Sequence, residues 1–331
     1  MQGDAPGYGL RKILVRQARQ GGIGVHDNII KKAVFMKQQI VGEFSVERVV
    51  EHEGPFAALQ QIIPQITSGQ IDANAHWLKP LFVDADNYAI MSFHSYILKT
   101  PHHTILIDAC VGNHKPRPAR PGWHLQNNGY LQAMARLGVA PESIDFVCCT
   151  HMHADHVGWN TQLVNGLWVP TFANAKYVFA KTEYTHWEQA HRTALATGQA
   201  VPNHGSFADS VLPVVDAGQA MLVAEDFEFE EGVYLQAARG HTPGNCMLHA
   251  HSQGAHAVFS GDILHTPAQL IDLNWSSHFC YDAQASAQTR KDLVHSLSDT
   301  SSLLLAAHFS GPVAGRIVSH GDQFRFQGVE A

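Results

Sequence analysis

The chain has 331 residues, 45% hydrophobic composition and a formal net charge of −7, so it can bury a large core. The acidic balance and the lack of an extended Lys/Arg run argue against a nucleic-acid ligand. No apolar span of about 18 residues and no signal-peptide pattern is present, so we expect no membrane insertion and a cytoplasmic location. The five cysteines lie mostly in apolar contexts and are expected to be reduced core thiols.

Residues 1–35 are rich in Gly, Gln, Arg and Lys and show no helical or alternating apolar pattern. We interpret them as an N-terminal extension, either disordered or derived from an upstream start codon, and residues 36–331 as one catalytic domain. Residues 41–50 alternate between apolar and polar side chains, which predicts a half-buried strand. Residues 56–66 have a short helical pattern.

Two further strands are predicted over residues 88–98 and 104–107, and Asp108 follows the second. The irregular loop 112–123 carries Lys115, Arg117 and Arg120. These cations could attract an anionic substrate, but the composition favours a solvated charged loop on the surface. A helix is predicted over residues 128–137.

The apolar run 144–149 predicts a buried strand that leads into the motif H-x-H-x-D-H at residues 151–156. Imidazole nitrogens and carboxylate oxygens are ligands that borderline divalent ions prefer. His151 and His153 are two apart on extended backbone, so they point the same way and can share one ion. Asp155 and His156 then turn toward a second ion.

Three more candidate ligands each follow an apolar, strand-like run: His241 in G-H-T-P-G, Asp262 in S-G-D and His308 in A-A-H-F. The remaining predicted elements are strands over residues 168–171, 176–180, 233–237, 246–251, 256–260 and 302–306, helices over 182–196 and 285–296, and a hairpin over 316–326.

Together these motifs resemble the metallo-β-lactamase superfamily over roughly residues 42–326. The resemblance implies an α+β fold, a four-layer αββα sandwich with one or two metals at the edges of its sheets. It implies that one metal is held by His151, His153 and His241, the other by Asp155, His156 and His308, and that Asp262 bridges them. The implied cofactor is zinc, two ions per chain, with Mn, Co or Fe as other divalent ions. In this family Asp108 would support the metal loop; a simple turn-forming role is the alternative.

The resemblance also implies a hydrolase that uses a metal-bound hydroxide on a small neutral ester-like substrate. Lactones and carboxylic esters come first, and organophosphate triesters are promiscuous candidates. Asp262 would orient the hydroxide with Asp155 beside it, while His265 is either the proton donor to the leaving group or an ordinary surface histidine. The substrate-binding candidates, each with a packing role as the alternative, are Trp187, Tyr184 and Trp159.

Two other functions stay open. The strings D-A-C-V-G-N-H-K at 108–115 and V-G-W-N-T at 157–161 look like the branch of hydrolytic dehalogenases that act on chlorothalonil, where a hydroxide displaces an aryl chloride. A non-catalytic metal-binding protein is disfavoured because no ligand position is substituted. A redox iron enzyme is disfavoured because flavodiiron proteins carry a carboxylate where His153 stands. The expected partner is a small molecule, and a homodimer is left open.

Overall fold

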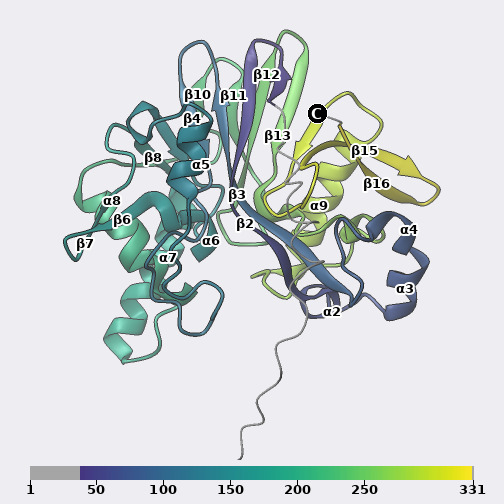
Figure 1. The fold of residues 1–331 in the computed structure, drawn as a ribbon, viewed down its shortest axis with the longest axis horizontal. Coiled ribbons are helices and arrows are strands. Elements are labelled where there is room, and N and C mark those ends of the chain that lie inside the picture. The colour runs from purple at the N-terminus through teal and green to yellow at the C-terminus, as the bar shows by residue number, and fades with distance from the viewer. Residues whose placement is uncertain (1–37, 330–331) are drawn as a thin grey trace, which may run out of the picture. The chain divides into compact units, whose positions relative to one another are not determined.

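The structure is a computed structural model that describes residues 38–329. These residues form two seven-stranded β-sheets and a separate two-stranded hairpin, with helices packed against the sheets (Figure 1). The α+β sandwich predicted from the sequence is therefore confirmed. The prediction for residues 1–35 lies outside the described range.

The first sheet is antiparallel through its first four strands and parallel through the rest. Parallel neighbours need long crossover connections, which here contain α5 (Tyr130–Arg136), α7 (Lys181–Thr197) and α8 (Leu212–Asp216). In spatial order the strands are β1 (Gln39–Val41), β2 (Phe44–Ala58), β3 (Tyr88–Lys99), β4 (Thr104–Ile107), β5 (Phe146–Cys148), β8 (Lys176–Ala180) and β9 (Ala220–Val223).

The second sheet is antiparallel except where α9 (Ala283–Leu297) crosses between β13 (Ala255–Phe259) and β14 (Leu303–Leu305). Its strands in spatial order are β10 (Glu228–Glu230), β11 (Val233–Ala237), β12 (Cys246–Ser252), β13 (Ala255–Phe259), β14 (Leu303–Leu305), β15 (Ala314–His320) and β16 (Gln323–Gly328). The shorter elements are α2 (Leu59–Ile62), α3 (Ser68–Ala73), α4 (Ala75–Leu78), α6 (Ala154–Val157) and the hairpin of β6 (Thr161–Val164) with β7 (Leu167–Pro170).

Strand alternation divides the core into two clusters. Tyr96 and Leu98 of β3 pack with residues of the second sheet, while Ile97 between them packs with Met134 of α5 on the outer face. The Tyr96 hydroxyl also donates to the Ala306 carbonyl at 2.7 Å, which ties the two sheets together next to a predicted ligand. The two sheets are thus fixed relative to each other beside the strand end that carries His308.

One predicted element is wrong at its start. Residues 56–58 were expected to be helical, but they continue β2, and the helix that follows is confined to Leu59–Ile62. Ala57 and Ala58 pair with Ala89 and Tyr88 of β3. Tertiary pairing therefore overrides the local helical pattern.

The interpretation of loop 112–123 as a solvated charge run is also wrong, because Lys115 and Arg117 are fully buried. The Arg117 guanidinium donates to both carboxylate oxygens of Asp209 at 2.6 and 2.8 Å. The Lys115 ammonium donates to Thr161 Oγ1 at 2.6 Å and to the Asp209 carbonyl at 3.0 Å. Burial lowers the pKa of Lys115 to about 7. These contacts fasten the loop to a segment about ninety residues later in the chain.

All five cysteines are free thiols, four of them buried, as the sequence predicted. Within residues 38–329, no helix combines the length and the apolarity that crossing a membrane requires.

Candidate metal centre

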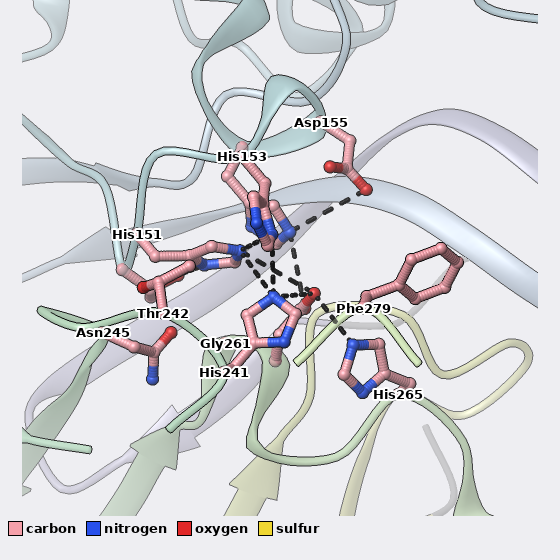
Figure 2. Close-up of polar contacts among 12 residues, drawn as sticks. His151, His153, Asp155, His241, Thr242, Asn245, Gly261, His265 and Phe279 are labelled. Atoms are coloured by element: carbon pink, nitrogen blue, oxygen red, sulfur yellow. Dashed lines mark hydrogen bonds and ion pairs between the residues drawn. The ribbon is translucent and has the colours of Figure 1, made fainter. Parts of the chain in front are cut away.

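The predicted ligands meet at the sheet edge where the two halves of the chain come together. Four of them follow β5, and the others follow β11, β13 and β14. Figure 2 shows the rings of His151, His153 and His241 turned toward one another, with Asp155 on the neighbouring turn. The Cys246 amide donates to the Thr150 carbonyl at 2.9 Å, so the first ligand loop is bonded directly to the second sheet.

The first ligand cluster consists of His151, His153, His241 and Asp262, whose ligand atoms lie within 4.8 Å of one another. His151 Nε2, His153 Nδ1 and His241 Nε2 form a triangle with sides of 2.8 to 3.1 Å. Each of these nitrogens carries either a proton and donates or a lone pair and accepts, so the three sides of the triangle cannot all be hydrogen bonds. A tetrahedral zinc ion places its nitrogen ligands about 3.3 Å apart, so this triangle fits a metal.

The second cluster consists of Asp155, His156 and His308. His308 Nε2 lies 3.1 Å, and His156 Nε2 3.4 Å, from Asp262 Oδ1. The other oxygen of this carboxylate, Asp262 Oδ2, lies 3.2 Å from His241 Nε2 in the first cluster. Asp262 therefore faces both clusters with different oxygens. Its Oδ1 atom and His156 Nε2 are buried and make no hydrogen bond within the described residues, as expected of atoms arranged for cations.

The second ring nitrogen of four ligand histidines has a fixed partner. His156 Nδ1 lies 2.8 Å from Asp108 Oδ2, and Asp108 also accepts from the Thr150 amide and hydroxyl. His308 Nδ1 donates to the Ser92 carbonyl at 3.1 Å, His151 Nδ1 lies 3.1 Å from Thr150 Oγ1, and His241 Nδ1 lies 3.6 Å from Cys280 Sγ. Such contacts orient the rings and set their tautomers. Asp108 thus supports the metal loop, as the resemblance implied.

Burial and neighbouring charges shift the pKa values of His156 and Asp262 in opposite directions. Burial alone would lower the pKa of His156, but the carboxylates of Asp262, Asp108 and Asp155 together raise it well above its usual range. For Asp262 burial alone would raise the pKa, but the surrounding histidines hold it well below its usual range. Metal ions bind the deprotonated imidazole, so metal binding at His156 should compete with protons and weaken in acid.

A cavity of about 240 Å³ opens onto the two clusters. Its walls are mainly aromatic, and its lining outside the ligands includes Phe56, Met91, Phe93, Arg120, Trp123, Trp187, His204, His265 and Phe279. Apolar walls with a few convergent polar groups are typical of small-molecule sites.

Besides the metal ligands, two of the sequence-predicted residues lie at this cavity. Trp187 lines it, with its ring centroid 5.6 Å from that of His153. His265 is buried, lies with Nε2 3.4 Å from Asp262 Oδ2, and has no hydrogen-bond partner at either ring nitrogen among residues 38–329. Figure 2 shows His265 beside Phe279, facing the ligands. The alternative of a surface histidine is therefore wrong.

The structure brings neither Tyr184 nor Trp159 to the cavity lining. The Tyr184 hydroxyl donates to Glu188 at 3.3 Å, and its ring packs against Phe207. Trp159 stacks on Tyr130 with ring centroids 5.0 Å apart. Its indole N–H donates to Glu51 at 2.7 Å. Both aromatic side chains are part of the packing behind the site.

Sequence reasoning missed Glu183, a buried carboxylate between the two ligand loops. It accepts hydrogen bonds from the Met152 amide at 2.9 Å, the Trp187 indole at 2.7 Å, the Thr242 hydroxyl at 2.7 Å and the Gly244 amide at 2.9 Å. A Cβ at Gly244 would lie 2.2 Å from the Glu183 nitrogen, so only glycine permits this approach. A glutamate in a mixed helical pattern gives no sequence signal for such a role.

The model of the metallo-beta-lactamase superfamily matches residues 94–308 of the chain. A search of curated proteins gives no match. The matched segment contains all seven predicted ligands, from His151 to His308.

Several solved structures share the fold. AbOPH, a hydrolase in the beta lactamase superfamily, has a TM-score of 0.72 at 18% identity, covering 89% of this chain and 97% of its own. AidC, a dizinc quorum-quenching lactonase in complex with the product N-hexnoyl-L-homoserine, has a TM-score of 0.69 at 18% identity, with 89% and 97% covered. A probable metal-dependent hydrolase from Staphylococcus aureus has a TM-score of 0.69 at 18% identity, with 88% and 99% covered. These structures show the shared fold, and the family match over residues 94–308 shows that the chain belongs to the metallo-beta-lactamase superfamily.

Proposed function

We propose that the chain is a two-metal hydrolase that uses zinc and acts on small ester-like substrates, above all lactones and carboxylic esters. The observation that carries this proposal is Asp262, whose two oxygens face two separate ligand clusters next to an aromatic cavity. Seven ligand side chains exceed the needs of one tetrahedral ion. When bound, a pair of ions supplies a hydroxide at neutral pH and polarises the oxygen of the substrate that gains charge.

The protein's own residues then position the reaction. Asp262 lies between the clusters and would orient the nucleophile, and Asp155 lies on the cavity wall at the second cluster. His265 lines the same cavity with Nε2 3.4 Å from Asp262 Oδ2 and would hydrogen-bond the substrate or its leaving group. Water would be excluded from the acyl portion of the substrate by three aromatic side chains of the lining, Trp187, Phe93 and Phe279.

The lining supports an ester or lactone before other substrates. Its aromatic walls suit the methylene groups of an acyl chain, and AidC, which shares the fold, is a dizinc lactonase. Organophosphate triesters would be secondary substrates, because the same geometry stabilises charge on a phosphoryl oxygen. Displacement of chloride from an aromatic ring is the second candidate, since Trp123, Trp187 and Phe56 could hold such a ring.

The test combines metal analysis with a substrate panel. We expect about two zinc ions per chain and hydrolysis of aryl esters and lactones that stops on chelation and returns with zinc. Paraoxon-type triesters and chlorinated aromatic nitriles form the other arms, read as nitrophenolate and chloride release. Chloride release without ester or lactone turnover would favour the second candidate function, hydrolytic dehalogenation of an aromatic ring. Full metal content without turnover on any arm would contradict the proposed function.

A further inference from the structure

Arg120 differs from the other buried or half-buried cations of its loop. Lys115 and Arg117 are committed to Asp209, whereas the half-buried Arg120 lines the cavity at the metal centre. Its backbone is held in a turn, since its amide donates to the Arg117 carbonyl at 2.8 Å and its carbonyl accepts from the Trp123 amide at 2.9 Å. This turn fixes the backbone from which the Arg120 side chain reaches the cavity.

Aromatic rings surround the guanidinium. Its central carbon lies 5.8 Å from the ring centroid of Phe56, 5.7 Å from that of Trp123 and 5.6 Å from that of Phe279. Ring faces attract a cation but accept no strong hydrogen bonds, so they hold the group without satisfying its N–H donors. Among residues 38–329, no carboxylate or other side chain pairs with the Arg120 guanidinium. The acids of the cavity, Asp155 and Asp262, face the ligand histidines instead.

We infer that Arg120 binds a carboxylate on the substrate, at the end remote from the bond that is cleaved. A guanidinium offers a planar pair of donors that matches the two oxygens of a carboxylate, and aromatic walls that keep out water strengthen the pairing. The substrate class is then an ester or lactone with a short acyl chain that ends in a carboxylate. This inference rests on the proposed function and departs from the neutral substrate expected from the sequence.

The position of the charge gives the pairing its specificity. The ring of Phe93 lies 5.1 Å from that of His308 and 5.7 Å from that of Trp123, and Arg120 lies 5.7 Å from the Trp123 ring. The ligand clusters would then fix the reacting carbonyl, and Arg120 would fix the acyl chain beyond these two rings. A substrate held at both ends loses less orientational freedom in the reaction, which raises kcat/KM. Arg120 thus acts as a specificity-determining residue and takes no part in bond cleavage.

Three matched aryl esters test the inference on the metal-loaded full chain. The 4-nitrophenyl esters of glutaric acid, 5-oxohexanoic acid and hexanoic acid present a carboxylate, a ketone or a methyl group at similar length. We expect the glutarate monoester to have the highest kcat/KM, and Arg120→Met to lower it by about tenfold to a hundredfold, mainly through KM. Hexanoate turnover should change by less than about threefold. Arg120→Lys keeps the charge without the planar fork, so its kcat/KM for the glutarate monoester should lie between those of the natural protein and Arg120→Met.

Arg136→Met, an exposed arginine on α5, serves as the matched control and should leave all three esters unchanged. The inference is overturned if Arg120→Met slows the three esters equally, or if the ketone ester exceeds the glutarate ester in the natural protein. It is also overturned if glutarate inhibits the natural protein and Arg120→Met equally, because the carboxylate would then bind the metals.

A binding experiment separates this inference from the proposed function. Glutarate should raise the melting temperature of the metal-loaded protein more than that of Arg120→Met, whether or not any ester is hydrolysed. If neither these esters nor any other substrate of the panel turns over, the proposed function fails, and the glutarate shift still decides whether Arg120 binds a carboxylate. Equal shifts in the two proteins would overturn the inference.

Discussion

Individual buried carboxylates determine the geometry of this site. Asp262 faces both ligand clusters, Asp108 orients His156, and Glu183 joins the loops that carry His151 and His241. Each would be costly to bury alone, and each is compensated by several donors or by histidines. The positions of their carboxylate oxygens therefore matter more for the geometry of the site than their negative charge alone.

We predict that Asp262→Asn lowers kcat by about a hundredfold or more, because an amide cannot place negative charge toward both clusters. Substrate binding should weaken much less, so the loss should appear in kcat before KM. Metal content and kinetics are measured together, with Asp292→Asn, exposed on α9, as control. Full metal content with unchanged kcat would exclude a bridging role.

Glu183→Ala should lower the free energy of unfolding by about 3 kcal/mol, since it leaves several buried donors without an acceptor. It should also weaken metal binding by about tenfold, because the two ligand loops lose their common anchor. Urea unfolding and metal titration measure the two effects. Glu188→Ala on the same helix loses the largely exposed Arg192 and a long hydrogen bond from Tyr184, and should cost less than about 1 kcal/mol and leave metal binding unchanged. Equal destabilisation by both variants would refute the anchoring role.

At the scale of elements, the sequence predicted what is encoded locally. Strands such as β8 and β12 carry their own apolar pattern, and the ligand motif follows directly on β5. The buried state of Lys115 and Arg117 could not be predicted, because their partner Asp209 lies far along the chain. Three other residues of the cavity wall, Phe56, Trp123 and Phe279, were missed for the same reason, since they meet only in the folded protein.

A group of stacked aromatic rings on neighbouring strands gives a prediction about pH. His249 of β12 and His256 of β13 are coplanar within 2°, with their ring nitrogens 3.0 Å apart. Burial and neighbouring histidines lower the pKa of each to about 4. Since the unfolded pKa is about 6.5, these residues stabilise the fold above pH 6.5, and that contribution is lost as the pH falls toward 4.

The double variant His249→Gln, His256→Gln should therefore lose less stability than the natural protein between pH 6.5 and 4. Urea unfolding across this range measures the difference, and comparison with the natural protein cancels the titration of the metal centre. His295→Gln, an exposed histidine on α9, is the control. An unchanged pH dependence in the double variant would show that the pair does not control acid stability.

At the scale of the whole molecule, the metal centre is where the two sheets are joined. Each ligand cluster, counting Asp262 in both, draws two members from the loop after β5 and two from loops of the second sheet. Neither sheet alone can form either cluster. Binding of ions should therefore stabilise the relative placement of the two sheets as well as the site.

Removal of metal should accordingly lower the melting temperature of the whole domain in one cooperative step. The stabilisation per site grows as the logarithm of free zinc, about 2.7 kcal/mol at one hundred times the dissociation constant. Calorimetry at buffered zinc concentrations measures it, and His153→Ala should reduce both the metal content and the dependence on zinc. A melting temperature independent of zinc in a protein that binds it would contradict this coupling.

The placement of the ligands has a consequence for a chain cut in two. The turn between β9 and β10, with Asp226 exposed, separates residues that supply the first four ligands from those that supply the last three. Two fragments divided at this turn would each carry an incomplete chelate, and an ion would be bound in full only when both were docked. Their association would then tighten as the zinc concentration rises, and a chelator would weaken a noncovalent pair that the ions and the buried apolar surface hold together.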